Sequence, residues 1–590
     1  MLRKPNYDKK PYIQVDGNND RIFCGYEEIC LKIYQEIKRK DQVKFIIAID
    51  AYQGVNLEPL VNNLLIRLNQ YTENSVSIID MSRALKKSED IDDYFKGNIT
   101  EDRIFGVLST HKLIEFFDKK VLKQIEDEVY AIKNDIVIIF GMGASFVGKY
   151  DLLIYGDMPR WEIQNRMRMN QVTNIGSKDF ELDFHRKYKR AFFLDWRVLD
   201  RHKQAIIHLS DYILDTVIEK SPKMIPLKGL MDGLQIAIHQ PFRVVPFFDP
   251  GPWGGQWMKE VCDLDQSKEN FAWCFDCVPE ENSLNLKFGN EIFEIPSINL
   301  VFEYPKELLG EKVYARFGTE FPIRFDFLDT MEGGNLSLQV HPLTEYIQQE
   351  FGMHYTQDES YYFLDAKEDA HVYLGVKENI QPELMINSLE VAQKGDGAFD
   401  ADHFVNKFSV KKHDHILIPA GTVHCSGKNA MVLEISSTPY IFTFKLWDWG
   451  RLGTDGLPRP INIAHGKNVI QWDRDTAWVE KNLINHVEVI SQGAGWIEER
   501  TGLHELEFIE TRRHWFEKQV EHDTNGSVNV LNLIQGEEAI VKSPSNRFEP
   551  FVVHYAETFI IPANIGLYSI APYGLSEGQQ IATIKAYVRI

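Results

Sequence analysis

Two stretches of this chain decide its fold: Leu-Ser-Leu-Gln-Val-His-Pro at 336–342 and Leu-Ile-Pro-Ala-Gly-Thr-Val-His at 417–424. In an extended strand the side chains alternate between two faces, so Gln339 and His341 point to the same side. We expect the two stretches to form two walls of one metal pocket. Two imidazoles, a carboxylate and an amide oxygen suit Zn²⁺ and leave room for water or a substrate oxygen. The expected ligands are Gln339, His341, Glu359 and His424.

Further motifs surround this pocket, and their order and spacing resemble one known family. They are Pro252-Trp253-Gly254-Gly255, Phe321-Pro322, Asp358-Glu359-Ser360-Tyr361-Tyr362, Tyr373-Leu374-Gly375 and Leu446-Trp447-Asp448-Trp449-Gly450-Arg451. From about Pro226 to the C-terminus the chain resembles the type I mannose-6-phosphate isomerases, which are zinc enzymes with two cupin domains. The resemblance implies that the four expected ligands hold zinc. Taken singly, each of these residues is better explained as a buried polar group that satisfies hydrogen bonds in a β core.

The resemblance also implies an enzyme, an isomerase of the intramolecular oxidoreductase class that interconverts mannose 6-phosphate and fructose 6-phosphate or a related sugar. Such a reaction moves a proton between adjacent carbons while charge builds on two oxygens, so it needs a Lewis acid and a positioned base. Glu434 stands where the family has a carboxylate considered for the base. It is explained equally well as a buried carboxylate bound to a backbone amide. The expected catalytic residues are Glu434, Lys445 and Arg451, and the expected substrate-binding residues are Ser337, Arg324 and Trp253.

The cations around the pocket differ from the family pattern. Gln357 and Asp326 stand where the family has lysines, and Lys445 stands where it has an arginine. Arg324 lies two residues before Asp326 and faces the same side of its strand. Lysine does not reproduce the forked geometry of arginine, so the last change is not neutral. These changes favour a second interpretation, a non-catalytic zinc cupin that binds a sugar and acts as a regulatory or scaffold protein.

Residues from about 20 to 220 have the pattern of an α/β domain. Short apolar runs alternate with stretches of helical spacing, which predicts a parallel sheet covered by helices. The expected strands are Phe45 to Asp50, Val76 to Ile79, Ile136 to Phe140 and Leu152 to Tyr155, and a helix is expected from Glu58 to about Gln70.

This region resembles the uridine kinase and phosphoribulokinase branch of the P-loop fold. The resemblance is carried by the first strand and its turn and by Asp135 to Gly141, Tyr150 to Asp157 and Arg166-Met167-Arg168. The turn at 50–57 has one glycine, no lysine and no serine or threonine for magnesium, so nucleotide hydrolysis is not expected. We therefore expect a degenerate kinase-like domain that serves as a docking surface or forms a homo-oligomer. A kinase with a different nucleotide loop is the remaining alternative.

The chain is expected to contain three domains, at 1–222, 223–470 and 471–590. Beyond the polar stretch around Pro222 the sequence becomes rich in strands, as in jelly-roll (cupin) domains, with one small helical insertion between 342 and 352. The last domain repeats the strand, turn and Ile-Pro-Ala pattern of the second. Leu567 takes the position of His424, so we expect the second cupin domain to lack metal ligands.

Composition limits the function classes. The chain has 590 residues, 44% of them hydrophobic and 26% charged, which is a composition typical of globular proteins. A net charge of −21 disfavours nucleic acid as a partner, although a local basic pocket can still bind a small anion such as a sugar phosphate. With no signal-peptide or membrane-spanning pattern and six cysteines, we expect a cytoplasmic protein without membrane contact. Cys274 and Cys277 form a lone Cys-x-x-Cys, more often structural than redox-active.

Overall fold

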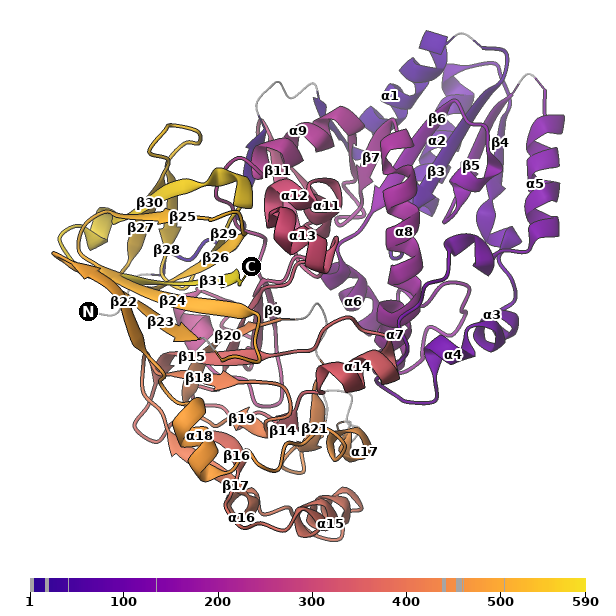
Figure 1. Cartoon of the computed structure of the whole chain (residues 1–590). Helices are drawn as coiled ribbons and strands as arrows, with labels where there is room; N and C mark the ends of the chain where they lie inside the picture. Colours follow the sequence, from indigo (N-terminus) through magenta and orange to yellow (C-terminus); the bar gives the residue numbers. More distant parts are fainter. Residues whose placement is uncertain are drawn as a thin grey trace. The chain divides into compact units, whose positions relative to one another are not determined.

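The computed structural model describes residues 5–15, 21–40, 42–133, 135–437, 442–452, 459, 461–502 and 504–589. The chain divides into two compact units, which can be followed by colour in Figure 1. Tyr12–Ile236 and Ser283–Ser297 form the first, here called the α/β unit. Met1–Pro11, Ala237–Asn282 and Ile298–Ile590 form the second, here called the β unit.

A seven-stranded sheet forms the centre of the α/β unit, in the order β2-β8-β7-β6-β3-β5-β4. The neighbouring strands β4, β5, β3, β6 and β7 run parallel, and β8 and β2 continue the sheet in antiparallel pairs. The bounds are β2 Phe23–Cys24, β3 Phe45–Ala51, β4 Val76–Asp80, β5 Ile136–Phe140, β6 Leu152–Asp157, β7 Tyr212–Asp215 and β8 Lys223–Pro226. The four expected strands and their parallel arrangement are thus confirmed. The domain boundary expected near residue 222 falls between the paired strands β7 and β8.

Helices α1 and α2 pack their apolar sides on this sheet. Alternate residues of β3, Phe45, Ile47 and Ile49, share one core with α1 and α2. Helix α2 is the one expected from Glu58, and it has Pro59 in its first turn, where a missing N–H costs nothing. The bounds are α1 Gly25–Lys40, α2 Glu58–Tyr71, α3 Ser88–Tyr94, α4 Lys96–Ile99, α5 Lys119–Ala131, α6 Arg160–Arg168, α7 Phe184–Arg190, α8 Trp196–Ile206 and α9 Leu227–Ala237.

The strand order places a topological switch point beside β3. The chain runs from β3 to β4 and back to β5 on one side, then crosses to β6 on the other side. Ligands of such sheets usually bind at the carboxyl ends of these strands. Here the buried carboxylate of Asp50 accepts hydrogen bonds from the amides of Gly143 at 2.9 Å and Ser145 at 3.1 Å. The loop after β5 therefore binds a side chain of its own unit. The P-loop ancestry of this unit stays a prediction.

A small three-stranded sheet completes the α/β unit. Its strands are β1 Ile13–Val15, β11 Ser283–Phe288 and β12 Glu291–Pro296. Strand β1 pairs parallel with β11, and β11 pairs antiparallel with β12. Because β11 and β12 lie far along the chain, the α/β unit is not one continuous stretch of sequence.

The β unit contains two sandwiches of antiparallel strands. The first β-sandwich has a six-stranded sheet, β18-β15-β20-β13-β10-β9, and a five-stranded sheet, β17-β16-β19-β14-β21. The bounds of the six are β9 Phe247–Asp249, β10 Trp273–Cys277, β13 Arg324–Asp329, β15 Glu359–Ala366, β18 His415–Ile418 and β20 Ala430–Ser436. The bounds of the five are β14 Leu338–Val340, β16 His371–Val376, β17 Val405–Ser409, β19 His424–Ser426 and β21 Phe444–Trp447.

The second β-sandwich lies at the yellow end of the colour bar in Figure 1. Its sheets have the orders β22-β23-β24-β31-β26-β29 and β25-β30-β27-β28, and both contribute to one apolar core. The bounds are β22 Glu488–Gly493, β23 Trp496–Gly502, β24 Ile509–Phe516, β25 Val520–Asp523, β26 Asn529–Gln535, β27 Glu538–Lys542, β28 Phe551–His554, β29 Thr558–Ile561, β30 Leu567–Pro572 and β31 Ile581–Val588. A multi-domain, sheet-rich fold is confirmed, whereas the jelly-roll assignment stays a prediction.

The β unit also contains several short helices. The expected insertion between 342 and 352 is α14, Thr344–Phe351. The others are α10 Trp257–Val261, α11 Ile298–Glu303, α12 Pro305–Leu309, α13 Glu311–Phe317, α15 Pro382–Gln393, α16 Ala401–Phe404, α17 Ile463–Gly466 and α18 Thr476–Asn482. Within the described residues, no helix combines the length and apolar character needed to cross a membrane. All six cysteines carry free thiols, and Cys274 and Cys277 are buried in β10.

Candidate metal centre

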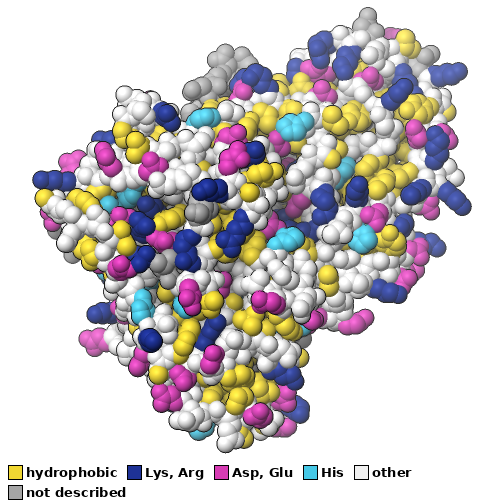
Figure 2. All heavy atoms as spheres, in the orientation of Figure 1, with side chains coloured by type: hydrophobic (Ala, Val, Ile, Leu, Met, Phe, Trp, Pro, Cys, Tyr) yellow, Lys and Arg dark blue, Asp and Glu magenta, His cyan; other side chains and the backbone are white. Residues whose placement is uncertain are grey.

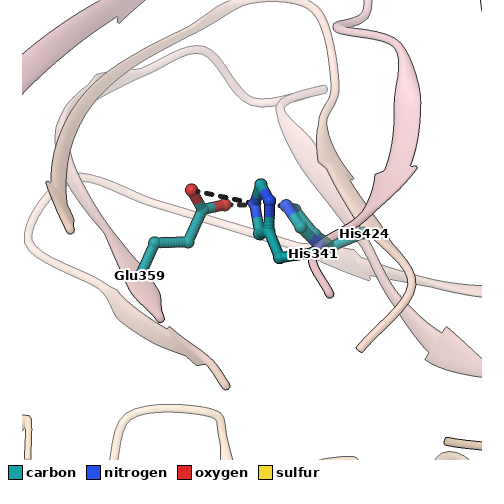
Figure 3. Close-up of side chains that lie close together, drawn as sticks. All are labelled: His341, Glu359 and His424. Atoms are coloured by element: carbon teal, nitrogen blue, oxygen red, sulfur yellow. Dashed lines mark ion pairs between the residues drawn. The ribbon is translucent and has the colours of Figure 1, made fainter. Parts of the chain in front are cut away.

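Three side chains suited to metal binding converge between the two sheets of the first β-sandwich. His341 follows β14 and His424 opens β19 in the five-stranded sheet, whereas Glu359 opens β15 in the six-stranded sheet. One ligand atom from each residue lies within 4.8 Å of the other two. Figure 3 shows the Glu359 carboxylate pointing towards both imidazoles. We call these three residues the metal cluster.

Backbone carbonyls orient both histidines. The Nδ1–H of His341 donates to the carbonyl of Phe442 at 2.7 Å, and that of His424 donates to the carbonyl of Thr422 at 2.9 Å. A carbonyl oxygen only accepts, so each neutral ring carries its proton on Nδ1. Both rings therefore present Nε2 to the interior of the site, as metal-binding histidines do.

The remaining contacts of the cluster are favourable only if a cation lies between the three side chains. Nε2 of His424 lies 2.7 Å from Oε1 of Glu359, and Nε2 of His341 lies 3.2 Å from Oε2. All three side chains are buried, and among the described residues His341 Nε2 and Glu359 Oε1 have no hydrogen-bond partner. A bare imidazole lone pair facing a carboxylate is repulsive unless a cation lies between them. The donor set thus fits a divalent metal ion.

The electrostatics of the cluster agree with this geometry. Burial alone raises the pKa of Glu359, but His341 and His424 outweigh it and hold that pKa well below its usual value. Burial lowers the pKa of His341, and the carboxylate of Glu359 outweighs this effect and raises it. The carboxylate is therefore charged at neutral pH and ready to bind a cation.

Gln339 lies beside the cluster. It is directly opposite His424 in the pairing of β14 with β19, and its Nε2 lies 3.2 Å from Nε2 of that ring. The hydroxyl of Ser337 donates to Gln339 Oε1 at 3.3 Å. The oxygen and nitrogen of an amide are assigned from their surroundings, so rotation of the Gln339 amide would turn its oxygen into the site. The structure therefore places Gln339 within reach of a metal held by the three other residues.

Gln357 connects the cluster to Glu434. Its amide nitrogen donates to Glu359 Oε2 at 2.9 Å and lies 3.3 Å from Glu434 Oε1. Glu434 is on β20, opposite Asp326 on β13, and its side chain is 6% exposed. Burial, reinforced by the charge of Glu359, raises the pKa of Glu434 well above its usual value. In the sequence Gln357 stands out only where a lysine is missing, whereas in the structure its amide links the two carboxylates.

Arg324 is engaged by a neighbour. Its Nε donates to Asp326 Oδ2 at 2.5 Å, and its Nη2 contacts the same oxygen. Both side chains are buried, so the positive charge of Arg324 is balanced within the strand that carries it. This pairing shows the two residues on the same face of β13, as expected from their spacing.

Lys445 and Arg451 lie near one another at the end of the five-stranded sheet. Lys445 pairs with Gln339 across β14 and β21. Arg451 and Arg459 both bind the buried carboxylate of Asp448, at 2.6 and 2.9 Å. Burial, together with Arg459 and Arg451, lowers the pKa of Lys445 to about 7.

Trp253 is a packed side chain. It is 2% exposed, and its ring lies edge-on to Trp273 with the centroids 4.6 Å apart. Gly334 lies against Trp253 and Arg451, since a Cβ at this glycine would lie 3.3 Å from the Arg451 guanidinium. Substrate binding by Trp253 stays a prediction.

Arg474 was not anticipated from the sequence. Its buried Nη1 lies 2.7, 2.6 and 2.5 Å from Pro419 O, Ala420 O and Thr422 Oγ1. Asp358 binds the same loop by accepting from the Ala420 amide at 2.7 Å. This loop carries the carbonyl that orients His424. Arg474 lies 50 residues beyond the motif, and no periodicity or spacing connects the two.

Comparison with known proteins gives two kinds of match. Residues 25–239 match the model of a domain of unknown function (DUF8485). The chain is similar to mannose-6-phosphate isomerase ManA of Bacillus subtilis (strain 168), with 24% identity over 233 residues, which is 39% of this chain and 68% of the relative. It is 26% identical over 220 residues to mannose-6-phosphate isomerase of Streptococcus mutans serotype c, covering 37% of this chain and 64% of the relative.

Solved structures give the same family names. The crystal structure of mannose 6-phosphate isomerase from Bacillus subtilis aligns over 59% of this chain and 99% of that one, with a TM-score of 0.48 and 20% identity. A variant of phosphomannose isomerase from Salmonella typhimurium aligns over 59% and 99%, with a TM-score of 0.43 and 12% identity.

Proposed function

We propose that this chain is a metal-dependent aldose–ketose isomerase of the mannose-6-phosphate isomerase type, acting on mannose 6-phosphate and fructose 6-phosphate or a related sugar. The observation that carries the proposal is the metal cluster, in which the Nε2 atoms of two buried histidines converge on one buried carboxylate, with their ligand atoms within 4.8 Å of one another. The similarity to isomerases from two bacteria supports the same reaction class.

His341, Glu359 and His424 would hold the metal ion, with Gln339 as the fourth ligand. Nitrogen and oxygen donors without a thiolate favour Zn²⁺ in a site that keeps one position open. When bound, the ion supplies a Lewis acid that stabilises negative charge on the oxygens of two neighbouring substrate carbons. Arg474 and the carbonyl of Thr422 would keep His424 in its ligating orientation.

Glu434 is the residue we propose for moving the proton between the two carbons. It is buried beside the metal cluster, and the amide of Gln357 fixes its distance from Glu359. Burial keeps bulk water away from the proton while it is transferred. Gln357 would thus act as a positioning residue.

Lys445 and Arg451 are the residues we propose for contact with the anionic part of the substrate. Lys445 lies opposite Gln339, and Arg451 shares the single carboxylate of Asp448 with Arg459, so these three cations outnumber their carboxylate, whereas Asp326 balances Arg324 one for one. A phosphate on the sugar would gain charge-assisted hydrogen bonds from these two cations.

The experiment is a coupled assay that converts mannose 6-phosphate to fructose 6-phosphate, run on the full chain before and after treatment with a chelator. We expect activity that is lost with the chelator and restored by Zn²⁺. His424→Ala should abolish turnover. His371→Asn changes a buried histidine of the same sheet outside the metal cluster and should retain it. Turnover that is unaffected by complete metal removal would refute the proposal.

A second candidate function is favoured by the Arg324–Asp326 pair and by Gln357. Asp326 and Gln357 stand where the resembled family has lysines, and Asp326 also balances the charge of Arg324. The first β-sandwich would then bind a sugar without converting it, and the α/β unit would dock a partner or a second copy. Calorimetric binding of fructose 6-phosphate by a fully metal-loaded chain that shows no turnover would select this function.

A further inference from the structure

The interior of the second β-sandwich is divided into an apolar half and a polar half. In the pairing of β24 with β31, Phe516 lies opposite Ile581, and both belong to the apolar core. Further along the same face, the pairing sets charged and polar side chains opposite one another. These pairs are His514 with Thr583, Arg512 with Lys585 and Glu510 with Tyr587. Because side chains alternate along a strand, these residues face the inside of the sandwich as Phe516 does.

A cavity of about 420 Å³ opens at this polar end. Its lining residues are Lys312, Glu510, Arg512, Asp523, Thr524, Asn525, Ser527, Asn529, Lys585, Tyr587, Val588 and Arg589. Four of them are basic and two are acidic, so the lining has a net charge of +2 on a chain whose net charge is −21. Figure 2 shows dark-blue side chains gathered where Figure 1 draws β24, β31 and the chain end. The volume is in the range of small-molecule sites.

Lys585 is a buried cation of this cavity that forms no ion pair with a described residue. Its side chain is 8% exposed, and its Nζ lies 3.4 Å from Nδ1 of His522. No carboxylate of the described residues lies within 4.0 Å of it. Glu510 forms no direct ion pair with Lys585 and instead accepts from Arg512 at 2.7 Å and from the Tyr587 hydroxyl at 2.6 Å.

Burying an ammonium group without an anion is unfavourable, and a bound anion removes the cost. Two histidines near Lys585 also have unpaired ring nitrogens. His522 lies beside Lys585, and the ring centroid of His514 lies 5.1 Å from that of His522. Nε2 of His522 and both ring nitrogens of His514 are buried, and within the described part of the chain they have no hydrogen-bond partner. His522 lies next to the lining residue Lys585, so these unpaired atoms extend the polar half of the sandwich behind the cavity.

We propose that this cavity is a ligand site for a small phosphate ester of a polyol. Lys585, with Arg589 and Lys312 at the lining, would bind the phosphate dianion. Asn525, an exposed residue of the lining, offers its amide to the hydroxyl groups, which an inorganic anion lacks. The site lies in the second β-sandwich and does not depend on the proposed function of the metal cluster. It gives the second β-sandwich a binding function beyond packing.

The test is calorimetric titration of the full-length His341→Ala/His424→Ala chain, in which the metal centre is dismantled. Fructose 6-phosphate, inorganic phosphate and fructose serve as probes. We expect fructose 6-phosphate to bind, inorganic phosphate to bind more weakly, and fructose to give no signal. Lys585→Met in this background should weaken binding of fructose 6-phosphate by roughly 10- to 100-fold, the effect of losing one charge-assisted hydrogen bond.

Lys518→Met is the matched control, because Lys518 is an exposed lysine of the same sandwich outside the cavity lining and should leave affinity unchanged. Lys312→Gln, on the exposed side of α13, provides a second variant that does not disturb the interior, and it should weaken binding to a smaller extent. Absence of fructose 6-phosphate binding would overturn the proposal, as would an affinity that neither Lys585→Met nor Lys312→Gln changes. Equal affinity for inorganic phosphate would refute the hydroxyl contacts. Isomerase activity of the unmodified chain is measured separately, so the proposed function is tested independently.

Discussion

Replacing Arg474 by methionine should weaken metal binding, although Arg474 touches none of the three residues of the metal cluster. Its Nη1 lies within hydrogen-bonding distance of Pro419 O, Ala420 O and Thr422 Oγ1, and it is 6% exposed. The nitrogen carries two hydrogens, so these contacts amount to about two full hydrogen bonds from a charged donor. Each contributes roughly 1.5–3 kcal/mol. Methionine keeps part of the volume and leaves no unpaired charge, so we expect a loss of about 2–4 kcal/mol of unfolding free energy.

The effect on the metal follows from the Thr422 carbonyl, which accepts from Nδ1 of His424 at 2.9 Å. Loss of a partner that orients a metal-binding histidine typically costs 10–100-fold in affinity. Arg474 acts one contact further away, so we expect about 10-fold, measured by competition for Zn²⁺ with a fluorescent chelator. Arg513→Met is the matched control. Arg513 is 8% exposed and bonds Glu499 at 2.7 Å and the His413 carbonyl at 2.8 Å. The Arg513→Met chain should lose a similar amount of unfolding free energy and keep its full affinity for Zn²⁺. Unchanged Zn²⁺ affinity in Arg474→Met would refute the reasoning.

Three further substitutions test other parts of the account. Lys445→Met should reduce turnover of mannose 6-phosphate at least 10-fold more than turnover of free mannose, because one charge-assisted contact to the phosphate is lost; equal losses on both sugars would show that Lys445 does not face a phosphate. Burial lowers the pKa of Lys585 to about 8, whereas an exposed lysine titrates near 10.4. The folded chain therefore binds fewer protons between these values, and its free energy of unfolding rises with pH there by up to roughly 3 kcal/mol. Lys585→Met should be more stable than the unmodified chain at pH 7, with the difference vanishing near pH 10, and a difference independent of pH would contradict this assignment. Calorimetry with ATP and magnesium should show no binding to the unmodified chain, because Asp50 already accepts from Gly143 and Ser145. Asp50→Asn should destabilise the chain without creating ATP binding, and micromolar affinity in either protein would show that the loop was misinterpreted.

The elements that were predictable from the sequence are those with strong local patterns. The β-branched apolar run at Phe45–Ala51 and the helical spacing in Glu58–Tyr71 specify β3 and α2 within one or two residues. The strand-turn motifs that carry His341 and His424 are also recognisable locally, whereas the proximity of the two histidines depends on the long-range pairing of β14 with β19. Glu359 comes from the other sheet and meets the histidines because the two sheets pack face to face. Its place in the site was inferred from a resemblance.

Long-range contacts carried no comparable signal. The hairpin of β11 and β12 joins the α/β unit, although it follows Ala237–Asn282 of the β unit in sequence. Helix α15, Pro382–Gln393, was not expected, since its helical spacing was not distinguished within a strand-rich region. Arg474 and Gln357 act through contacts with residues distant in sequence, and only the folded chain reveals their partners. The polar half of the second β-sandwich has no local sequence signal, because His514, His522 and Lys585 come from three separate strands, β24, β25 and β31.

The most direct test of the central claim is the zinc content of purified chains, measured by elemental analysis after dialysis against a moderate concentration of chelator. The metal cluster predicts one zinc ion per unmodified chain and per His371→Asn chain. It predicts almost none in His341→Ala and His424→Ala, because a site reduced by one ligand holds the ion poorly. Full zinc occupancy in both alanine variants, or none in the unmodified chain before chelation, would contradict the assignment of His341, Glu359 and His424 as a metal centre.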